Sequence, residues 1–287
     1  MPQLIQIRQR IKAVSTIKKI TSAMRLISRS FHARMYREQA HYKEYQAALS
    51  NLMGTVLSHV PSEVKSHFSK PASTTEKQLF IIIGSQKGLC GSFNAPLIYW
   101  IDSHKEQLTT KNTHVVSIGK RVTEYLHKVG TRNLVTLPEL KLTSIESLTQ
   151  KLLAFVDSDE RYSQVTVLSC SPRSLFSQEF KEHQLFPLAF PDTCAVAQAR
   201  YDYSWNHDPE AILKVLVRIH LTERLRSSLF MSLLAEHNAR FAAMDNATRN
   251  AENFLDTMKV QFNKMRQAKI TKELTELAGA FEIQSLI

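Results

Sequence analysis

The chain has 287 residues, 43% of them hydrophobic, and a formal net charge of +11, so it can form an ordinary core and favours acidic partners. No apolar run approaches the roughly 20 residues that a membrane-spanning helix requires, and the N-terminus lacks the apolar core of a secretory signal. Three cysteines, Cys90, Cys170 and Cys194, form no CxxC pair, which argues against a disulfide framework and against a metal site.

The first fifty residues predict one long helix. The range Gln3–Met53 contains neither glycine nor proline, and apolar residues recur in steps of three and four from Leu4 onward. This is the spacing of a coiled-coil stripe, which we expect to end between Gly54 and Pro61. One additional step of three, between Val14 and Ile17, predicts a phase slip that locally overwinds the supercoil.

The same end of the chain is strongly basic. Residues 1–37 contain nine lysines or arginines and no acidic residue. Three interpretations are open: a solvated face, a nucleic-acid surface, or a surface that docks on an acidic protein. Nucleic-acid binding would require more stacking aromatics than Phe31 and Tyr36. A mitochondrial transit peptide would also be arginine-rich, but the apolar spacing runs on past residue 50 and favours a structural helix.

The middle of the chain alternates short apolar runs with helical ones. Three runs rich in branched residues predict buried strands, at Leu79–Gly84, His114–Ile118 and Gln164–Leu168. Helical patterns accompany them at Pro96–Gln107, Lys120–Val129 and Ser144–Val156. The alternation predicts a small parallel sheet with right-handed crossovers, covered by helices. Residues 171–207 give no clear pattern.

The C-terminal part predicts a second long helix. Asp208 followed by Pro209 is a helix start, because aspartate caps free amides and proline fits the first helical position. No further glycine or proline occurs before Gly279, and apolar or small residues step by three and four from Phe241 to Met265. At ~1.5 Å per residue this helix would be on the order of 100 Å long, more than a compact globule needs.

Together these patterns predict an α/β protein in which the N- and C-terminal helices form a long antiparallel coiled coil around an inserted small Rossmann-like α/β domain. Each apolar stripe needs a partner, and the insert returns the chain to the same end. The expected boundaries are a coiled-coil helix at 1–60, the α/β globular domain at 61–207 and a coiled-coil helix at 208–287.

No catalytic or cofactor-binding residue is predicted. The loop Gly84–Gly91, GSQKGLCG, follows a strand and precedes a helix, but Lys87 stands before Gly88, so the phosphate-binding order GxxxxGK[ST] is not met. We expect its glycines to serve a tight turn and Cys90 to be buried and structural. The carboxylates and histidines show no spacing typical of acid–base chemistry.

Three segments carry a resemblance. Residues 8–27, RQRIKAVSTIKKITSAMRLI, resemble the opening of the gamma subunit of the F-type ATP synthase, bacterial form. GLCG at Gly88–Gly91 is similar to a hallmark of that family, and residues 236–279 closely resemble its most characteristic stretch. The resemblance implies a non-catalytic central rotor shaft, which couples proton flow through the membrane sector to ATP synthesis at the beta subunits of the alpha-beta hexamer. It implies no cofactor.

The resemblance also implies partners and a location. The partners would be the alpha, beta, epsilon and delta subunits and the c-ring, without nucleic acid, at the cytoplasmic side of a bacterial inner membrane, where the chain would be peripheral. The family pattern begins within ten residues of Met1, so no transit peptide is expected. The residues implied to contact the alpha-beta hexamer are Lys19, Thr21, Ala23, Met24, Arg266, Gln267 and Thr271.

The sequence departs from the family pattern in places. Phe31 and His32 occur in a run that is usually KLRRAQ-like, the chain ends in FEIQSLI after Ala280, and no cysteine-bearing insertion is present, so no thiol switch is expected. Two other functions stay open at this point. One is a basic coiled-coil scaffold or nucleic-acid-binding protein, and the other is a small α/β enzyme built on the Gly84–Gly91 loop.

Overall fold

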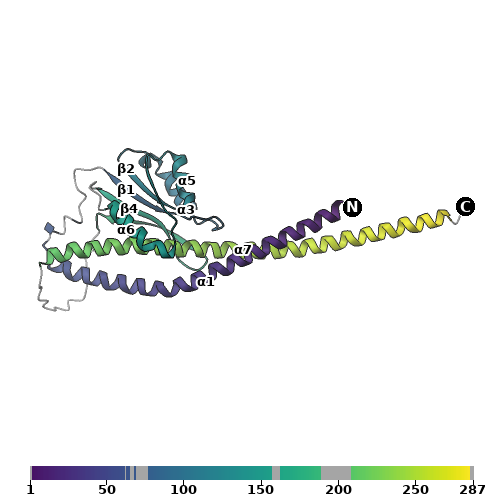
Figure 1. The fold of residues 1–287 in the computed structure, drawn as a ribbon, viewed down its shortest axis with the longest axis horizontal. Helices are drawn as coiled ribbons and strands as arrows, with labels where there is room; N and C mark the ends of the chain where they lie inside the picture. The colour runs from purple at the N-terminus through teal and green to yellow at the C-terminus, as the bar shows by residue number, and fades with distance from the viewer. Residues whose placement is uncertain are drawn as a thin grey trace. The chain divides into compact units, whose positions relative to one another are not determined.

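The structure is a computed structural model that describes residues 2–61, 63–64, 68, 77–156, 162–188 and 208–284. Residue contacts divide the chain into two units, which are described separately. Residues 1–27 and 241–287 form the first, called here the coiled-coil unit, and residues 28–240 form the second, called the α/β unit. Each unit contains part of both long helices, α1 (Pro2–His59) and α7 (Pro209–Gln284), which carry the two chain ends in Figure 1.

The two long helices begin and end where the sequence predicts. Helix α1 stops at His59, two residues before Pro61. Helix α7 begins at Pro209, and the backbone N–H of Glu210 donates a hydrogen bond to Oδ1 of Asp208 at 3.1 Å. The predicted aspartate cap is therefore confirmed. No helix among the described residues is long and apolar enough to cross a membrane.

The cap gives a direct test of how α7 begins. Replacing Asp208 with alanine removes the acceptor for the Glu210 amide and is expected to lower the free energy of unfolding by about 1 kcal/mol. Urea denaturation measures the change. Asp208→Asn keeps a capping oxygen and should stay close to the parent protein, so equal losses in both variants would contradict the role of the cap.

The α/β unit contains one mixed sheet of five strands: β1 (Gln78–Ile83), β2 (Thr113–Ile118), β3 (Asn133–Leu137), β4 (Gln164–Pro172) and β5 (Gln178–Phe186). The order is β3-β2-β1-β4-β5, with β5 antiparallel to β4 and all other pairs parallel. The expectation of a parallel sheet is therefore wrong for β5. This strand occupies an edge, where charged and polar residues are tolerated and where an apolar run is not required.

The shorter helices largely match the prediction: α3 (Ala95–Ser103), α4 (Lys105–Leu108), α5 (Lys120–Val129) and α6 (Ile145–Val156), the last preceded by the 3-10 turn η1 (Leu142–Ser144). The single helix expected over Pro96–Gln107 is wrong, because it breaks at His104. That residue leaves helical geometry, with φ −116° and ψ 23°, and its ring stacks on Trp100 with centroids 4.1 Å apart.

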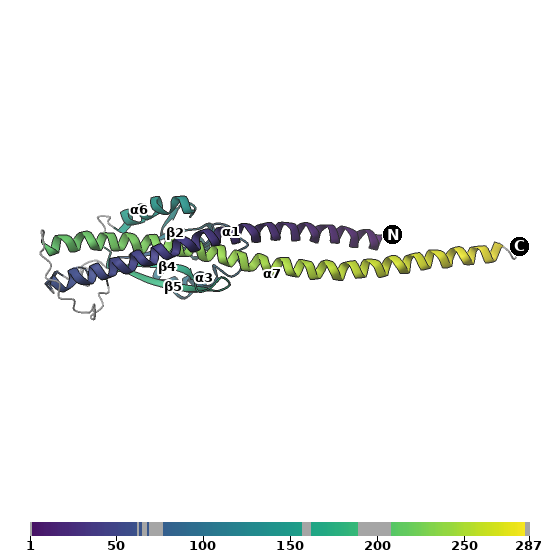
Figure 2. The same ribbon diagram turned by 90° about the horizontal axis from the view of Figure 1, so that it is seen from below.

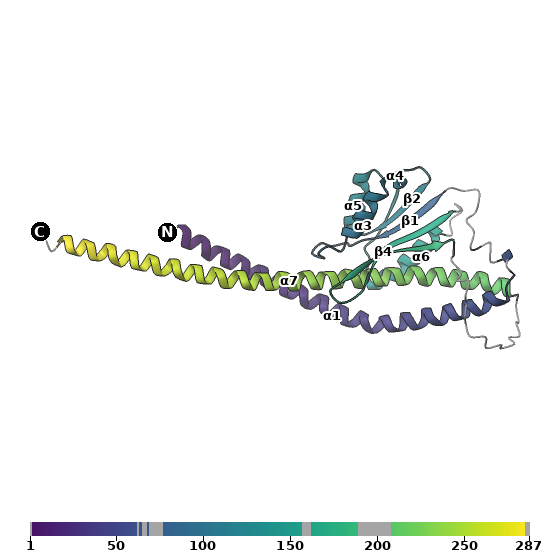
Figure 3. The same ribbon diagram turned by 180° about the vertical axis from the view of Figure 1, so that it is seen from behind.

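Both faces of the sheet are buried. In β1, Leu79, Ile81 and Ile83 pack with residues of α6 and α7, whereas Phe80 and Ile82 pack with residues of α3 and α5. Figures 1 and 3 show α3 and α5 on the side of the sheet away from α7. A central strand covered on both faces is typical of α/β folds, and it explains why β1 is apolar from Leu79 to Ile83.

In the coiled-coil unit, α1 and α7 run antiparallel. The residues of α1 that face α7 are spaced alternately three and four residues apart, without a break. They are Leu4, Ile7, Ile11, Val14, Lys18, Thr21 and Arg25. The predicted phase slip is therefore wrong, because the contact line continues through polar residues while the apolar Ile17 and Ile20 point outward. The expected stripe on α7 is confirmed, with Met244, Thr248 and Ala251 buried among its members. Figure 2 shows the two helices from below.

Candidate partner surface of the coiled coil

The centre of the coiled-coil unit is held by a polar contact. Thr248 donates its hydroxyl to Oγ1 of Thr21 at 2.9 Å, and Thr21 in turn donates to the backbone carbonyl of Lys18 at 3.1 Å. Both threonines are buried. The Thr248 hydroxyl can also donate to the backbone carbonyl of Met244 at 2.7 Å, so each threonine has an acceptor on its own helix. The contact marks the register of α1 against α7, in which Thr21 lies opposite Thr248.

Ion pairs flank this contact on both sides. Lys18 Nζ lies 3.1 Å from Oε1 of Glu252, and Arg25 Nη1 lies 2.9 Å from Oδ1 of Asp245. Asp245 also binds Arg249 on its own helix, through Oδ2 at 2.8 Å. The numbers of the residues paired across the helices add to 269 or 270, so Pro2 at the start of α1 lies opposite residue 268. Beyond that point α7 continues without α1 beside it.

The outer surface of this unit is unusually apolar. Ile17, Ile20 and Ile27 of α1 are exposed by 52%, 54% and 66%. Further large apolar side chains of the same unit are exposed: Ile5, Leu26, Phe254, Val260, Ile270, Leu274 and Leu277. Single exposed apolar residues are ordinary, but a surface with this many is typical of a protein that binds a partner over a wide area.

The same surface is positively charged. Residues 1–27 contain six lysines or arginines and no acid, whereas residues 241–287 contain six basic and six acidic residues. Lys18 and Arg25 are neutralised by α7, but Arg8, Arg10, Lys12 and Lys19 have no ion pair within the part of the chain that the structure describes. The remaining positive charge therefore lies on α1 and suits an acidic partner.

The sequence-predicted contact residues all lie in the coiled-coil unit, in two separate groups. On α1, Lys19 and Ala23 are exposed, Met24 is half-buried and Thr21 is buried in the polar contact. On α7, the members are exposed: Arg266, Gln267 and Thr271. By the register of the ion pairs, residue 266 lies opposite Leu4, roughly 25 Å along α1 from the first group. The structure does not bring the two groups together.

The Gly84–Gly91 loop lies at the carboxyl end of β1, next to β4, where the strand order reverses and where α/β folds commonly bind ligands. Here the chain's own side chains close the loop. Asn94 accepts the N–H of Ser85 at 3.0 Å and donates to its hydroxyl at 2.7 Å, while the buried Cys90 thiol lies 3.5 Å from the same hydroxyl. The expected turn conformation is found at Gly91, with φ 56°, whereas Gly84 permits close packing, because a Cβ there would lie 2.2 Å from Val122.

A buried group in the α/β unit was not anticipated from the sequence. Glu236 forms an ion pair with Arg240, and both side chains are less than 10% exposed. Burial raises the pKa of Glu236, although Arg240 opposes this shift. The ring of His237 stacks on Phe31 with centroids 3.6 Å apart, and burial together with Arg240 and Lys87 lowers its pKa to about 4.

Two residues that depart from the family pattern gain a structural reason here. Phe31 provides the stacking surface for His237, and Nδ1 of His32 lies 2.6 Å from Oδ1 of Asn238. Both contacts join α1 to α7 within the α/β unit. The two partners on α7 could not be read from helical spacing alone. No group of three potential metal ligands occurs among the described residues.

Comparisons with known proteins agree with this architecture. The family model described as ATP synthase matches residues 3–283. The ATP synthase gamma chain of Rickettsia bellii is 31% identical over 98% of this chain and 99% of its own length, and that of Clostridium acetobutylicum is 28% identical over 97% of each. The chain belongs to the ATP synthase gamma-chain family. It is a gamma subunit, part of the central rotor stalk of the complex.

Solved structures support the fold of this family member. A chain of the Euglena gracilis mitochondrial ATP synthase, in an OSCP/F1/c-ring structure, matches with a TM-score of 0.70 at 11% identity, over 99% of this chain and 95% of that one. A chain of the Tetrahymena thermophila mitochondrial ATP synthase, in a central stalk and c-ring structure, matches with a TM-score of 0.56 at 17% identity, over 79% and 99%. The predicted coiled coil with an α/β insert is thus confirmed as a gamma-chain fold.

Proposed function

We propose that this gamma-family chain is a non-catalytic rotor shaft that couples proton flow through the membrane sector to ATP synthesis at the beta subunits of the alpha-beta hexamer. The observation that carries the proposal is the outer surface of the coiled-coil unit, which combines exposed isoleucines with unpaired cations. A surface of this kind is suited to an enclosing partner and not to water. The closed Gly84–Gly91 loop favours a supporting role over nucleotide chemistry.

The chemistry of the surface fits movement within such a partner. Apolar side chains such as Ile17, Ile20 and Ile27 make contacts without directional hydrogen bonds, so rotation breaks few bonds that must be formed again. The helix pair is also asymmetric, because its unpaired cations lie on α1. As the shaft turns, each beta subunit meets a basic and then a less basic face. The ion pairs of Lys18 with Glu252 and of Arg25 with Asp245 join α1 to α7 while torque acts on them.

The proposed contacts with the hexamer lie at two levels of this shaft. Lys19, Ala23 and Met24 present their side chains at the first, where Thr21 lies against Thr248. The second level lies about 25 Å away on α7. Its proposed members are exposed in the chain alone and free to meet loops of the beta subunits: Arg266, Gln267 and Thr271.

We further propose that the epsilon and delta subunits and the c-ring are partners, and that the complex lies at the cytoplasmic face of a bacterial inner membrane with this chain peripheral to it. Two findings support this assignment. The structural neighbours come from F1/c-ring and rotor structures of a mitochondrial ATP synthase, and the gamma chains compared above come from bacteria.

Co-expression with alpha and beta subunits tests the shaft assignment. The expected result is a stoichiometric complex that hydrolyses ATP, and addition of membrane sectors should make hydrolysis drive proton transport. Failure of this chain to copurify with correctly folded alpha and beta subunits would overturn the proposal. A control assembly without the chain shows whether the hydrolysis depends on it.

A charge at Met24 provides a finer test. Met24→Lys places a cation in the proposed sliding contact, where desolvation is costly, so assembly should persist while proton transport per ATP hydrolysed falls severalfold. Proton pumping and hydrolysis are measured on the same vesicles. Met24→Leu keeps an apolar side chain of similar size and should leave the ratio unchanged. An unchanged ratio in Met24→Lys would show that this side chain does not lie in the contact.

A further inference from the structure

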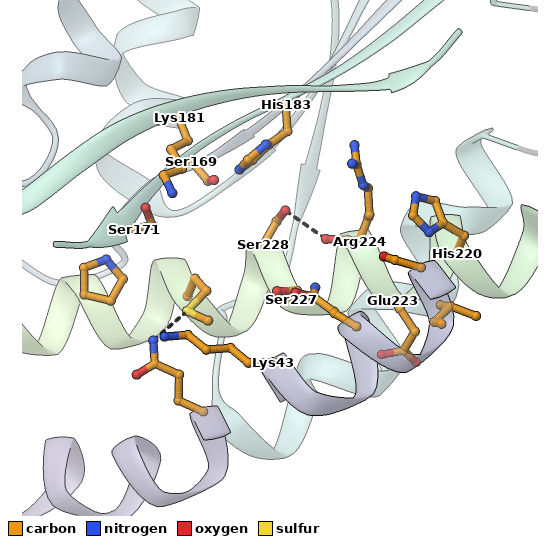
Figure 4. A pocket seen from close by; sticks show the side chains of 16 residues that line it. Lys43, Ser169, Ser171, Lys181, His183, His220, Glu223, Arg224, Ser227 and Ser228 are labelled. Atoms are coloured by element: carbon orange, nitrogen blue, oxygen red, sulfur yellow. Dashed lines mark hydrogen bonds between the residues drawn. The ribbon is translucent and has the colours of Figure 1, made fainter. Parts of the chain in front are cut away.

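A polar cavity of about 400 Å³ lies within the α/β unit, between the sheet and the two long helices. Its walls come from the carboxyl end of β4, from the middle of β5, from one face of α7 and from one face of α1. Figure 4 shows Ser169, Ser171, Lys181 and His183 on the strands, facing the helix that carries Arg224. This volume falls within the range of small-molecule binding sites and is many times the volume that one buried water molecule needs.

The cavity begins where the hydrophobic core stops. On one face of β4 the side chains run from the buried Val165 and Val167 to Ser169 and Ser171. Directly across the sheet, Lys181 of β5 pairs with Ser169 in the antiparallel register. A strand that continued the core would place apolar residues here, so the change to hydroxyl and ammonium groups creates a polar wall in a protected position.

The positive charges of the cavity have no carboxylate partner. Lys43, Lys181 and Arg224 form no ion pair within the described residues. Glu223 also lines the cavity, but its Oε1 lies 3.0 Å from Nη1 of Arg226, outside the lining. Arg224 is exposed at the mouth of the cavity, and its Nη1 donates to the backbone carbonyl of Gln184 at 3.4 Å, so its guanidinium keeps free donors for a ligand.

One hydroxyl of the cavity is unsatisfied. Ser171 is only 8% exposed, and its Oγ has no hydrogen-bond partner in the described structure. Ser228 differs, because its hydroxyl donates to the carbonyl of Arg224 at 2.9 Å. A buried hydroxyl without a partner costs free energy, and a ligand that accepts a hydrogen bond would remove this cost.

From the unpaired cations and the free Ser171 hydroxyl around one cavity, we propose that the α/β unit binds a phosphate-bearing small molecule between β4, β5 and α7. Arg224 and Lys181 would hold the phosphate oxygens, and Ser171 would donate a hydrogen bond to one of them. Arginine suits this role because its planar guanidinium can bind two phosphate oxygens at once. The remaining volume accepts a second phosphate or a small organic group.

The probe for the test is inorganic pyrophosphate, added to the full-length chain at constant ionic strength in chloride buffer and followed by calorimetry. The expected result is saturable one-site binding that weakens at least tenfold in Arg224→Gln and severalfold in Ser171→Ala. Arg132→Gln removes one exposed arginine outside the cavity and should bind as the parent chain does. Ser171→Ala should not reduce stability, because it removes an unsatisfied group.

The ring signals of two cavity histidines give a second readout that needs no variant. Burial lowers the pKa of His183 and lowers that of His220 to about 4, with Arg224 adding to both shifts and Lys181 to the first. Lys43 and Glu223 complete the titratable lining. A bound phosphate offsets the positive charges, so both histidines should titrate at higher pH when pyrophosphate is present.

Three results would overturn the proposal. They are the absence of saturable binding, equal affinity in Arg224→Gln and the parent chain, and a loss in Arg224→Gln without one in Ser171→Ala. The last would show that net charge alone attracts the anion. All of these measurements use the chain without other subunits, so their failure leaves the shaft assignment, tested by copurification, unaffected.

Discussion

Replacing Arg240 with methionine is expected to lower the free energy of unfolding of the α/β unit by about 3–5 kcal/mol, because it leaves a buried carboxylate without its counterion. The side chains of Arg240 and Glu236 are 8% and 9% exposed, so water cannot substitute for the lost partner. Urea denaturation followed by tryptophan fluorescence measures the change, since Trp100 is buried in this unit.

The matched control is Arg249→Met on the same helix. Arg249 also pairs with an acid four residues earlier, Asp245, but its side chain is 70% exposed, so the expected loss is below about 1 kcal/mol. Adding Glu236→Gln to Arg240→Met should restore part of the stability. Burial already raises the pKa of Glu236, so the loss in Arg240→Met should be smaller at pH 5 than at pH 8. Equal losses in Arg240→Met and Arg249→Met would show that the buried pair has no special cost.

Acid is expected to destabilise the α/β unit through two histidines, beginning well above the pH at which carboxylates protonate. Burial, with Arg224 nearby, lowers the pKa of His220 from 6.5 to about 4, and burial with Arg240 and Lys87 does the same for His237. Below pH 6.5 the unfolded chain binds a proton at each ring, but the folded chain does not until about pH 4. The two histidines therefore make their full contribution to the free energy of unfolding above pH 6.5, and this contribution is lost as the pH falls toward 4.

The size of this effect follows from the shifts. One pKa unit corresponds to ~1.4 kcal/mol, so protonation of each histidine should lower the free energy of unfolding by up to about 3 kcal/mol by pH 4. Glu223 and Glu236 act in the opposite direction, because burial raises the pKa of each. The difference between the parent chain and His220→Gln or His237→Gln isolates the histidines. Curves of unfolding free energy against pH that run parallel in parent and variants would contradict the expected linkage.

The periodicity of apolar residues predicted the two long helices well. It predicted only in part which of their residues face each other. The rule that apolar residues face inward holds for Met244 and Ala251 on α7. It fails on α1, where Thr21 faces the partner helix while Ile17 and Ile20 are exposed. A helix that is apolar on its outer face as well has no single best stripe, so spacing alone could not choose the correct one and produced a false phase slip.

The sheet shows a similar division. Central strands β1, β2 and β4 are covered on both faces and were recognisable as apolar runs, whereas the edge strands β3 and β5 were not. Part of the unclear range 171–207 forms β5, and residues 189–207 lie outside the described residues. The contact residues were implied by family resemblance and stay a proposal. The cavity, by contrast, depends on Ser171 and Arg224, which are 53 residues apart and lie together only in the folded chain.

The single-helix end of α7 has a consequence for how the chain engages its partner. Past residue 268 the helix lies beyond the start of α1, and its side chains pair along the helix itself, as Lys272 does with Glu276. A lone helix of about 15 residues is marginally stable in water, so its amides should exchange with solvent deuterium much faster than those opposite Val14. Enclosure by a partner would slow this exchange, and part of the association free energy would go into ordering the last turns.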